Sequence, residues 1–130
     1  GLLEQLEYEG FTEEQALRMS ASFGGGIGRM RQTCGAACGM FLLAGLEKGA
    51  VDGKDREGKA ANYALVQELA EEFKKRNGSM ICAELLGLKK PEGSSTPEAR
   101  TEQYYAKRPC AKMVEEAATI WAEYLEKQQE

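Results

Sequence analysis

Apolar residues recur every three or four positions along most of the chain, and no stretch of alternating apolar and polar residues predicts a β-strand. Thr12 and Gln15 have the spacing of a capping box, which predicts a short helix that extends to about Phe23. Four glycines within residues 24–28 end that helix. A second helix is predicted over residues 33–48, where apolar side chains surround the axis and indicate a buried, central position.

The helical pattern continues in the second half of the chain. A long amphipathic helix is predicted after a turn at residues 51–53, and it ends at the Asn-Gly pair of residues 77–78, a C-cap pattern. Ser79 is a candidate cap for a short helix over residues 80–86. Residues 89–101 are rich in Pro, Gly and Ser and predict the one long loop of the chain.

Helices are also predicted after this loop. A cap and first turn at residues 96–98 begin a helix towards Tyr104, and the last helix begins near Pro109. The apolar stripe of the last helix consists of Met113, Val114, Ala117, Ile120, Trp121, Tyr124 and Leu125. We therefore predict an all-α fold, a compact bundle of about five or six helices that forms a single domain over residues 1–130.

Charge and composition restrict the classes of partner that we expect for such a domain. The formal net charge is −4 and acidic and basic residues are interspersed, which argues against nucleic acid and anionic membranes as partners. The longest apolar run, residues 36–46, contains glycines and is too short to cross a bilayer, so we expect no membrane insertion. The chain begins with Gly1 and no signal-peptide pattern, and we expect a cytoplasmic protein.

Three of the four cysteines lie where helices are predicted to begin. Cys34 opens the second helix, Cys82 lies three residues after Ser79, and Cys110 directly follows Pro109. The unpaired N–H groups and the positive dipole end of a helix N-terminus favour a thiolate over a thiol. We therefore predict that Cys34, Cys82 and Cys110 are the reactive or metal-binding cysteines of this chain.

Cys38 differs from the other three because it lies one turn inside the second helix. Its Cβ atom is expected about 5–6 Å from that of Cys34, too far for an unstrained disulfide, whereas two sulfurs on one metal ion would tolerate this gap. The apolar surroundings also favour a plain packing role, since free cysteine often behaves as a small hydrophobe. The chain has no histidine, which excludes Cys-His catalysis by this chain alone.

These observations leave three alternatives open. Cys34 could exchange a disulfide with Cys82 or Cys110. A metal centre could instead use Cys34, Cys38, Cys82 and Cys110, and an all-thiolate set favours an iron–sulfur cluster or zinc. In the third alternative the protein is a non-catalytic helical interaction module whose cysteines are structural, and a homodimer would fit this interpretation.

The glycines around the first cysteines are candidate cofactor-binding residues. They are Gly24, Gly25, Gly26, Gly28, Gly35 and Gly39. A glycine run before a helix can bind phosphate, with Arg29 and Arg31 as counter-charges, but neither a dinucleotide fingerprint nor a P-loop is present. The favoured role is to let the backbone pass close to the cysteines with positive φ angles.

The order of these motifs resembles a known family. A glycine run, FGGGIGRM, precedes CGAACG at residues 34–39, followed by Cys82 before ELLG and by Cys110 at the start of the last helix. This order resembles the small bacterial and archaeal proteins named for their C_GCAxxG_C_C pattern and described as candidates for redox activity. The resemblance marks Cys34, Cys82 and Cys110 as motif cysteines, with Gly35, Ala36 and Gly39 completing the central motif.

The resemblance implies redox or metal chemistry and has one departure. The resemblance implies four shared cysteines, and the analogy with a related domain in multi-cofactor cytochromes implies iron–sulfur binding and electron transfer with a redox partner protein. The family's first cysteine precedes the glycine run, and none lies between Gly1 and Phe23. Either that cysteine precedes Gly1 or this member lacks it, and in the second case Cys38 would supply the fourth sulfur.

Overall fold

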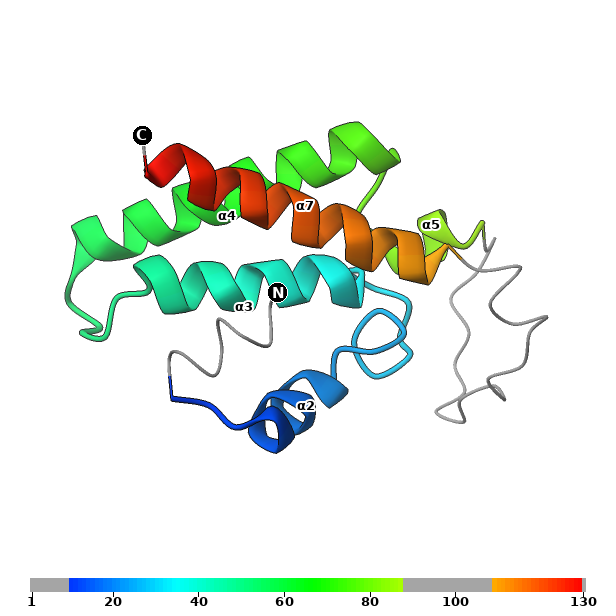
Figure 1. The fold of residues 1–130 in the computed structure, drawn as a ribbon, viewed down its shortest axis with the longest axis horizontal. Helices are drawn as coiled ribbons and strands as arrows, with labels where there is room; N and C mark the ends of the chain where they lie inside the picture. The colour runs from blue at the N-terminus through cyan, green and yellow to red at the C-terminus, as the bar shows by residue number, and fades with distance from the viewer. Residues whose placement is uncertain (1–9, 88–108, 130) are drawn as a thin grey trace.

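The computed structural model describes residues 10–87 and 109–129 (Figure 1). Over these residues the protein consists of helices and no β-strand, which confirms the all-α prediction. The helices are α2 (Glu13–Ala21), α3 (Gly35–Lys48), α4 (Arg56–Asn77), α5 (Cys82–Leu85) and α7 (Cys110–Gln128). The predicted helix near Tyr104 and the predicted loop at residues 89–101 lie outside the described residues. Within the described ranges, every helix is too short or too polar to span a membrane.

Local signals set the ends of α2 and α4, whereas the prediction that Ser79 caps α5 is wrong: the N-cap is Ile81, and the Ser79 hydroxyl accepts the Ile81 N–H at 3.0 Å before the helix begins. At α2, the Gln15 N–H donates to Thr12 Oγ1 at 3.1 Å while the Thr12 N–H donates to Gln15 Oε1 at 3.0 Å, so the capping box is present. Asp55 caps α4 by accepting from the Gly58 N–H at 2.9 Å, and Gly78 ends that helix with a φ of +87°. These bonds satisfy backbone groups that helix ends otherwise leave unpaired.

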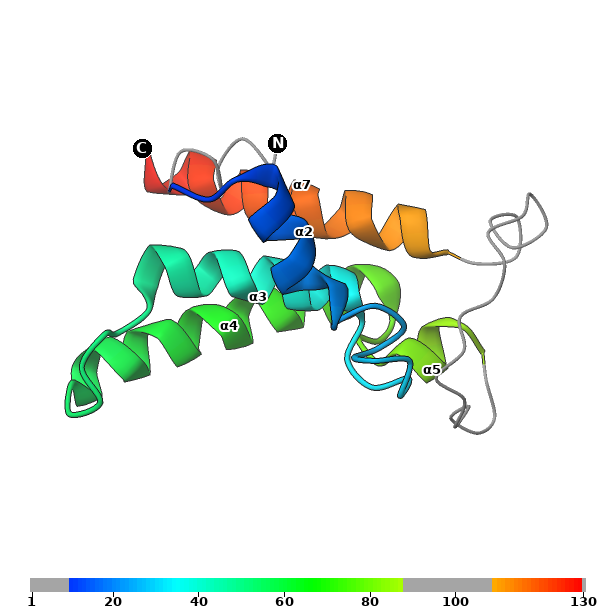
Figure 2. The same ribbon diagram turned by 90° about the horizontal axis from the view of Figure 1, so that it is seen from below.

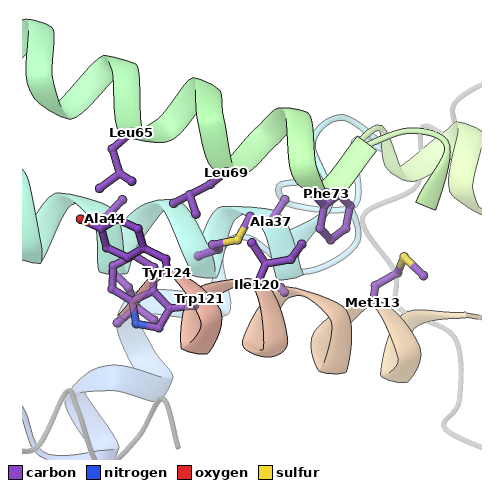
Figure 3. Close-up of a cluster of buried hydrophobic side chains, with 12 residues drawn as sticks. Ala37, Ala44, Leu65, Leu69, Phe73, Met113, Ile120, Trp121 and Tyr124 are labelled. Carbon is purple, nitrogen blue, oxygen red and sulfur yellow. The ribbon is translucent and has the colours of Figure 1, made fainter. Parts of the chain in front are cut away.

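The core lies between α3, α4 and α7, which run side by side (Figures 1 and 2). Leu69 and Phe73 of α4 point towards Ile120 of α7, and Trp121 stacks against Tyr124 with ring centroids 5.1 Å apart (Figure 3). The core cluster consists of Ala37, Met40, Leu43, Ala44, Leu65, Leu69, Phe73, Met113, Ala117, Ile120, Trp121 and Tyr124. Burial of such side chains contributes about 1.5–3 kcal/mol each, so this cluster dominates the stability of the fold.

Helix α3 is less central than its apolar composition predicts. One side packs in the core, but Leu42 and Leu46 are each 38% exposed and face a groove between α3 and α2. This groove has a volume of about 460 Å³, and its lining consists of Phe11, Ala16, Leu17, Met19, Ser20, Gly39, Leu42, Leu43, Gly45 and Leu46. Val114, which we placed in the apolar stripe of the last helix, is likewise exposed.

One end of the bundle gathers the starts of several helices. Figure 1 shows α5 and the first turn of α7 at the same end, beside the loop that joins α2 to α3. The backbone of that loop pairs with the segment before α5, since the Cys34 N–H donates to the Met80 carbonyl and the Cys82 N–H to the Gln32 carbonyl. Three of the four cysteines lie at this end, so the fold brings together residues about fifty positions apart in the sequence.

Candidate thiol site

The loop between α2 and α3 has a left-handed backbone. Gly25, Gly26 and Gly28 have φ angles of +67°, +74° and +58°, which confirms the positive φ angles expected for the glycine run. The non-glycine residues Ile27 and Arg29 are left-handed too, with φ angles of +67° and +63°. A side chain in this conformation costs roughly 1–2 kcal/mol, so the surrounding contacts must hold the loop in place.

Backbone hydrogen bonds supply those contacts. The Gly28 N–H donates to the Ser22 carbonyl at 2.7 Å, the Arg31 N–H to the Gly25 carbonyl at 3.0 Å and the Gln32 N–H to the Gly26 carbonyl at 2.8 Å. All N–H groups from residue 27 to residue 32 bond to carbonyls within residues 22–27. They are therefore turned inward, and an anion bound to the glycine run would have to displace these bonds.

Gly26 explains why glycine is needed beside a cysteine. A Cβ atom at this position would lie 2.5 Å from the Cβ of Cys82 and 2.6 Å from the backbone nitrogen of Gln32. Real Cβ atoms do not approach other heavy atoms this closely, so the loop can pass Cys82 only with glycine at this point. The expected role of the glycine run, close passage beside a cysteine, is confirmed at Gly26.

Between residues 10 and 87, an isolated antiparallel bridge pairs Thr33 with Ile81. In this register Cys34 lies opposite Met80, and Cys82 lies opposite Gln32. Side chains alternate between the two faces of a bridge, so Cys34 and Cys82 share the face opposite to Thr33 and Ile81. The two cysteines are thus diagonal neighbours across the bridge.

All four cysteines lie within the described residues, and all four are free thiols. They differ in accessibility, because Cys82 and Cys38 are buried, Cys34 is half-buried and Cys110 is exposed. Cys34 is the N-cap of α3, while Cys82 and Cys110 are the first residues of α5 and α7. The prediction that three cysteines occupy helix N-termini is therefore confirmed.

Arg31 places a positive charge beside Cys82. It is 4% exposed, and its Nη1 donates a hydrogen bond to Cys82 Sγ over 3.7 Å. The Arg31 backbone is left-handed, with a φ of +61°, and its carbonyl accepts the Ala83 N–H at 3.2 Å, which holds the residue against the start of α5. The sequence suggests Arg31 only as a counter-charge for phosphate, because nothing in the local pattern shows that position 31 is buried against position 82.

The protonation of Cys34 corrects the expectation of a favoured thiolate. Burial raises the pKa of the Cys34 thiol above its ordinary value. The Ala36 and Ala37 N–H groups lower this pKa, but burial has the larger effect. Negative charge on Cys82 or Cys110 raises the pKa further. In the reduced protein Cys34 is therefore a thiol at neutral pH, and its charge is coupled to both other motif cysteines.

Cys38 is a buried neighbour of this group. Its pKa is raised by burial and then by the charge of Cys34, and its thiol donates to the Thr33 carbonyl over 4.0 Å. It lies one turn into α3, among core side chains. These surroundings fit the packing role that the sequence favoured for it.

The metal prediction has no matching geometry in the described part of the chain. Within residues 10–87 and 109–129, no three cysteine, aspartate or glutamate side chains are arranged so that they could hold a metal ion. The described residues thus do not fit an iron–sulfur or zinc centre as they stand, and such a centre stays a prediction. Of the glycines named as cofactor-binding, Gly26 contacts the thiol site, Gly35 begins α3, and Gly39 lines the α2–α3 groove.

The described residues thus form a helical bundle with three helix-terminal thiols at one end. A comparison with known protein families shows to which family the chain belongs. The model of the family described as "Putative redox-active protein (C_GCAxxG_C_C)" matches residues 2–124, so the chain belongs to the C_GCAxxG_C_C family. No curated protein and no solved structure matches the chain.

Proposed function

We propose that this protein is a thiol–disulfide redox protein in which Cys34 and Cys82 form a reversible disulfide. The family description supports redox activity, and the bridge register supports this pair of cysteines. The single observation that carries the proposal is that Cys34 and Cys82 share one face of the bridge between Thr33 and Ile81, with a buried arginine at Cys82.

The different exposures of the two thiols assign their roles. Cys34 is half-buried and can be reached from outside, whereas Cys82 is buried. In oxidation, the Cys34 thiol first gives its proton to water, and the thiolate so formed attacks a disulfide of the partner, forms a mixed disulfide and releases one partner thiolate. The Cys82 thiolate then attacks Cys34 Sγ, which closes the internal disulfide and releases the second partner thiolate. The protein loses two protons and two electrons, and the partner disulfide becomes a dithiol.

Arg31 assists the reverse reaction. When a partner thiolate attacks the disulfide at Cys34 Sγ, the sulfur of Cys82 must leave with the electron pair of the broken bond. A guanidinium 3.7 Å from that sulfur stabilises the departing negative charge, and its burial limits screening by water. Arg31 is therefore a positioning and charge-stabilising residue for this step.

Disulfide formation requires a small movement. Diagonal neighbours across an antiparallel bridge have Cα atoms about 7–8 Å apart. Disulfides usually join Cα atoms about 4.4–6.8 Å apart. The start of α5 must therefore approach Cys34 by roughly 1–2 Å, the difference between these two ranges. Helix α5 has only four residues, so the movement involves a short segment, of which Leu85 packs against the core.

The test is to oxidise the purified reduced protein with 2-hydroxyethyl disulfide and to map the disulfides by peptide mass spectrometry. We expect a bond between Cys34 and Cys82 that dithiothreitol reverses. Cys34→Ser and Cys82→Ala should each abolish this bond, while Cys38→Ala is the matched control and should leave it intact. Circular dichroism of the reduced variants checks that each one folds.

The role of Arg31 is tested by comparing two variants. Arg31→Lys keeps a positive charge at the same left-handed position and Arg31→Met removes it, so the backbone strain is equal in the two variants. We expect reduction by dithiothreitol to be slower in Arg31→Met than in Arg31→Lys, because only the methionine variant lacks a cation near the leaving sulfur. A Cys34 to Cys82 bond that never forms, or iron or zinc bound stoichiometrically by these cysteines in anaerobically purified protein, would overturn the proposal.

A further inference from the structure

We infer that Cys110 is an entry thiol, the residue at which a protein or peptide disulfide too bulky to reach Cys34 exchanges with this protein. The inference rests on the proposed function, because it concerns how oxidising equivalents reach the pair formed by Cys34 and Cys82. It assigns a role to the one motif cysteine that the proposed internal disulfide does not use.

Accessibility is the first observation behind this assignment. The three cysteines form a series, since Cys110 is exposed, Cys34 is half-buried and Cys82 is buried. Attack on a disulfide requires the thiolate sulfur to approach in line with the S–S bond, and a bulky partner therefore reacts with the most accessible thiol. Of the three, Cys110 meets that condition best.

The position of α7 is the second observation. Pro109 and Met113, which flank Cys110 in the first turn of α7, line one shallow pocket together with Glu84 and Leu85 of the α5 segment. Figures 1 and 2 show the start of α7 and α5 at the same end of the bundle. Cys110 is thus held at the end of the molecule that contains Cys34 and Cys82, and the charge on Cys110 acts on Cys34.

These positions define a relay of three exchanges. The Cys110 thiolate attacks the external disulfide, forms a mixed disulfide and releases one external thiolate. The Cys34 thiol then gives its proton to the released external thiolate, and its sulfur attacks Cys110 Sγ and releases the second external thiolate, which leaves a disulfide between Cys34 and Cys110. Finally the Cys82 thiolate attacks Cys34 Sγ and frees Cys110 as a thiolate. The external disulfide gains two electrons, and the protein has lost two thiol protons.

The experiment compares a small and a bulky oxidant on the full chain. Glutathione disulfide is the bulky, peptide-like probe and 2-hydroxyethyl disulfide is the small one. We expect Cys110→Ser to slow formation of the Cys34 to Cys82 bond by roughly tenfold or more with glutathione disulfide and to change it little with the small probe, because the small probe reaches Cys34 directly. Cys38→Ala is the control and should change neither rate.

Two further variants trap the intermediates. Cys34→Ser stops the relay after its first step, so glutathione should accumulate on Cys110. Cys82→Ala stops it after the second step, so a disulfide between Cys34 and Cys110 should accumulate. Both products are identified by peptide mass spectrometry. Serine is a preferred N-cap, so Cys34→Ser should fold at least as well as the parent chain.

The outcomes separate this inference from the proposed function. If the parent chain and Cys110→Ser form the Cys34 to Cys82 bond at the same rate with both probes, the relay is wrong and the proposed function stands. If Cys82→Ala is folded but never joins Cys34 to Cys110, the relay is wrong as well. If the parent chain forms no bond between Cys34 and Cys82 with either probe, the proposed function itself fails.

Discussion

Two regions of the molecule are held together by different kinds of contact. Side chains form the core between α3, α4 and α7, whereas backbone hydrogen bonds build the thiol site at the end of the bundle. The core is held by apolar side chains such as Phe73 and Trp121, whose contacts depend on volume and burial. The thiol site is held by a left-handed loop whose N–H groups bond inward and by one antiparallel bridge. Substitutions in the core should thus change stability most, whereas substitutions in the loop should change the chemistry of the cysteines.

The largest expected effect is in the core. Phe73→Ala removes a ring that is 0% exposed and leaves a cavity between the three helices, which should lower the free energy of unfolding by about 3–5 kcal/mol. Val114→Ala is the control, because Val114 is exposed on α7 and should change the stability by less than about 0.5 kcal/mol. Urea denaturation measures both. Equal losses in the two variants would contradict the placement of the core.

The next effect tests the loop with a matched pair of glycines. Gly26→Ala and Gly28→Ala both place a side chain at a positive φ, at a cost of roughly 1–2 kcal/mol each. Only Gly26→Ala also meets Cys82, whereas a Cβ at Gly28 has nothing within 4 Å. We expect an additional loss of roughly 1–3 kcal/mol for Gly26→Ala, from overpacking.

The same pair should separate stability from chemistry. Because Gly26→Ala pushes against Cys82, it should also change the rate at which the internal disulfide closes, while Gly28→Ala should leave that rate near the parent value. Oxidation with 2-hydroxyethyl disulfide under folding conditions measures this rate. If the two variants have the same stability and the same rate of disulfide closure, the contact between Gly26 and Cys82 affects neither quantity.

Alkaline pH should weaken the reduced protein through its buried thiols. Burial raises the pKa of Cys34 and of Cys38 in the folded chain, whereas an unfolded cysteine titrates near about 8.5. The stabilisation from keeping these groups as thiols is complete below the unfolded pKa. It is lost as the pH rises from there through the folded pKa, because the unfolded state releases its protons first.

Thermal melts between pH 7 and 10 in the presence of a reductant would show this loss. Replacing both residues in the variant Cys34→Ser, Cys38→Ala should flatten the pH dependence over that range. Tyr124 also has a pKa raised by burial, with smaller contributions from the charges of Glu47 and Glu68, so some dependence should remain at the highest pH. A parent chain that becomes more stable as the pH rises would contradict the burial of these thiols.

The smallest effect concerns the glycines of α3. Gly39→Ala and Gly45→Ala should each raise the free energy of unfolding by about 0.5–1 kcal/mol, because alanine favours a helix and a Cβ at either position meets nothing within 4 Å. Gly35→Ala is the contrast, since its Cβ would lie 2.7 Å from the Phe23 carbonyl oxygen and should destabilise the protein. Urea denaturation measures all three. Destabilisation by Gly39→Ala would contradict the open space beside this residue.

The sequence by itself determined the features that depend on neighbours a few residues away. The capping box at Thr12, the left-handed stop at Gly78 and the helix-terminal positions of Cys34, Cys82 and Cys110 follow from short-range patterns. The capping box and the stop at Gly78 depend on hydrogen bonds between residues three or four positions apart, and a local pattern contains that information.

Only the tertiary structure decided which of these residues meet and in which protonation state. The register that puts Cys34 and Cys82 on one face, the position of Arg31 against Cys82 and the contact at Gly26 join segments about fifty residues apart. Burial likewise reversed the expected sign of the Cys34 pKa shift. Desolvation is a property of the folded surface around an atom, and the spacing of residues along a helix does not contain it.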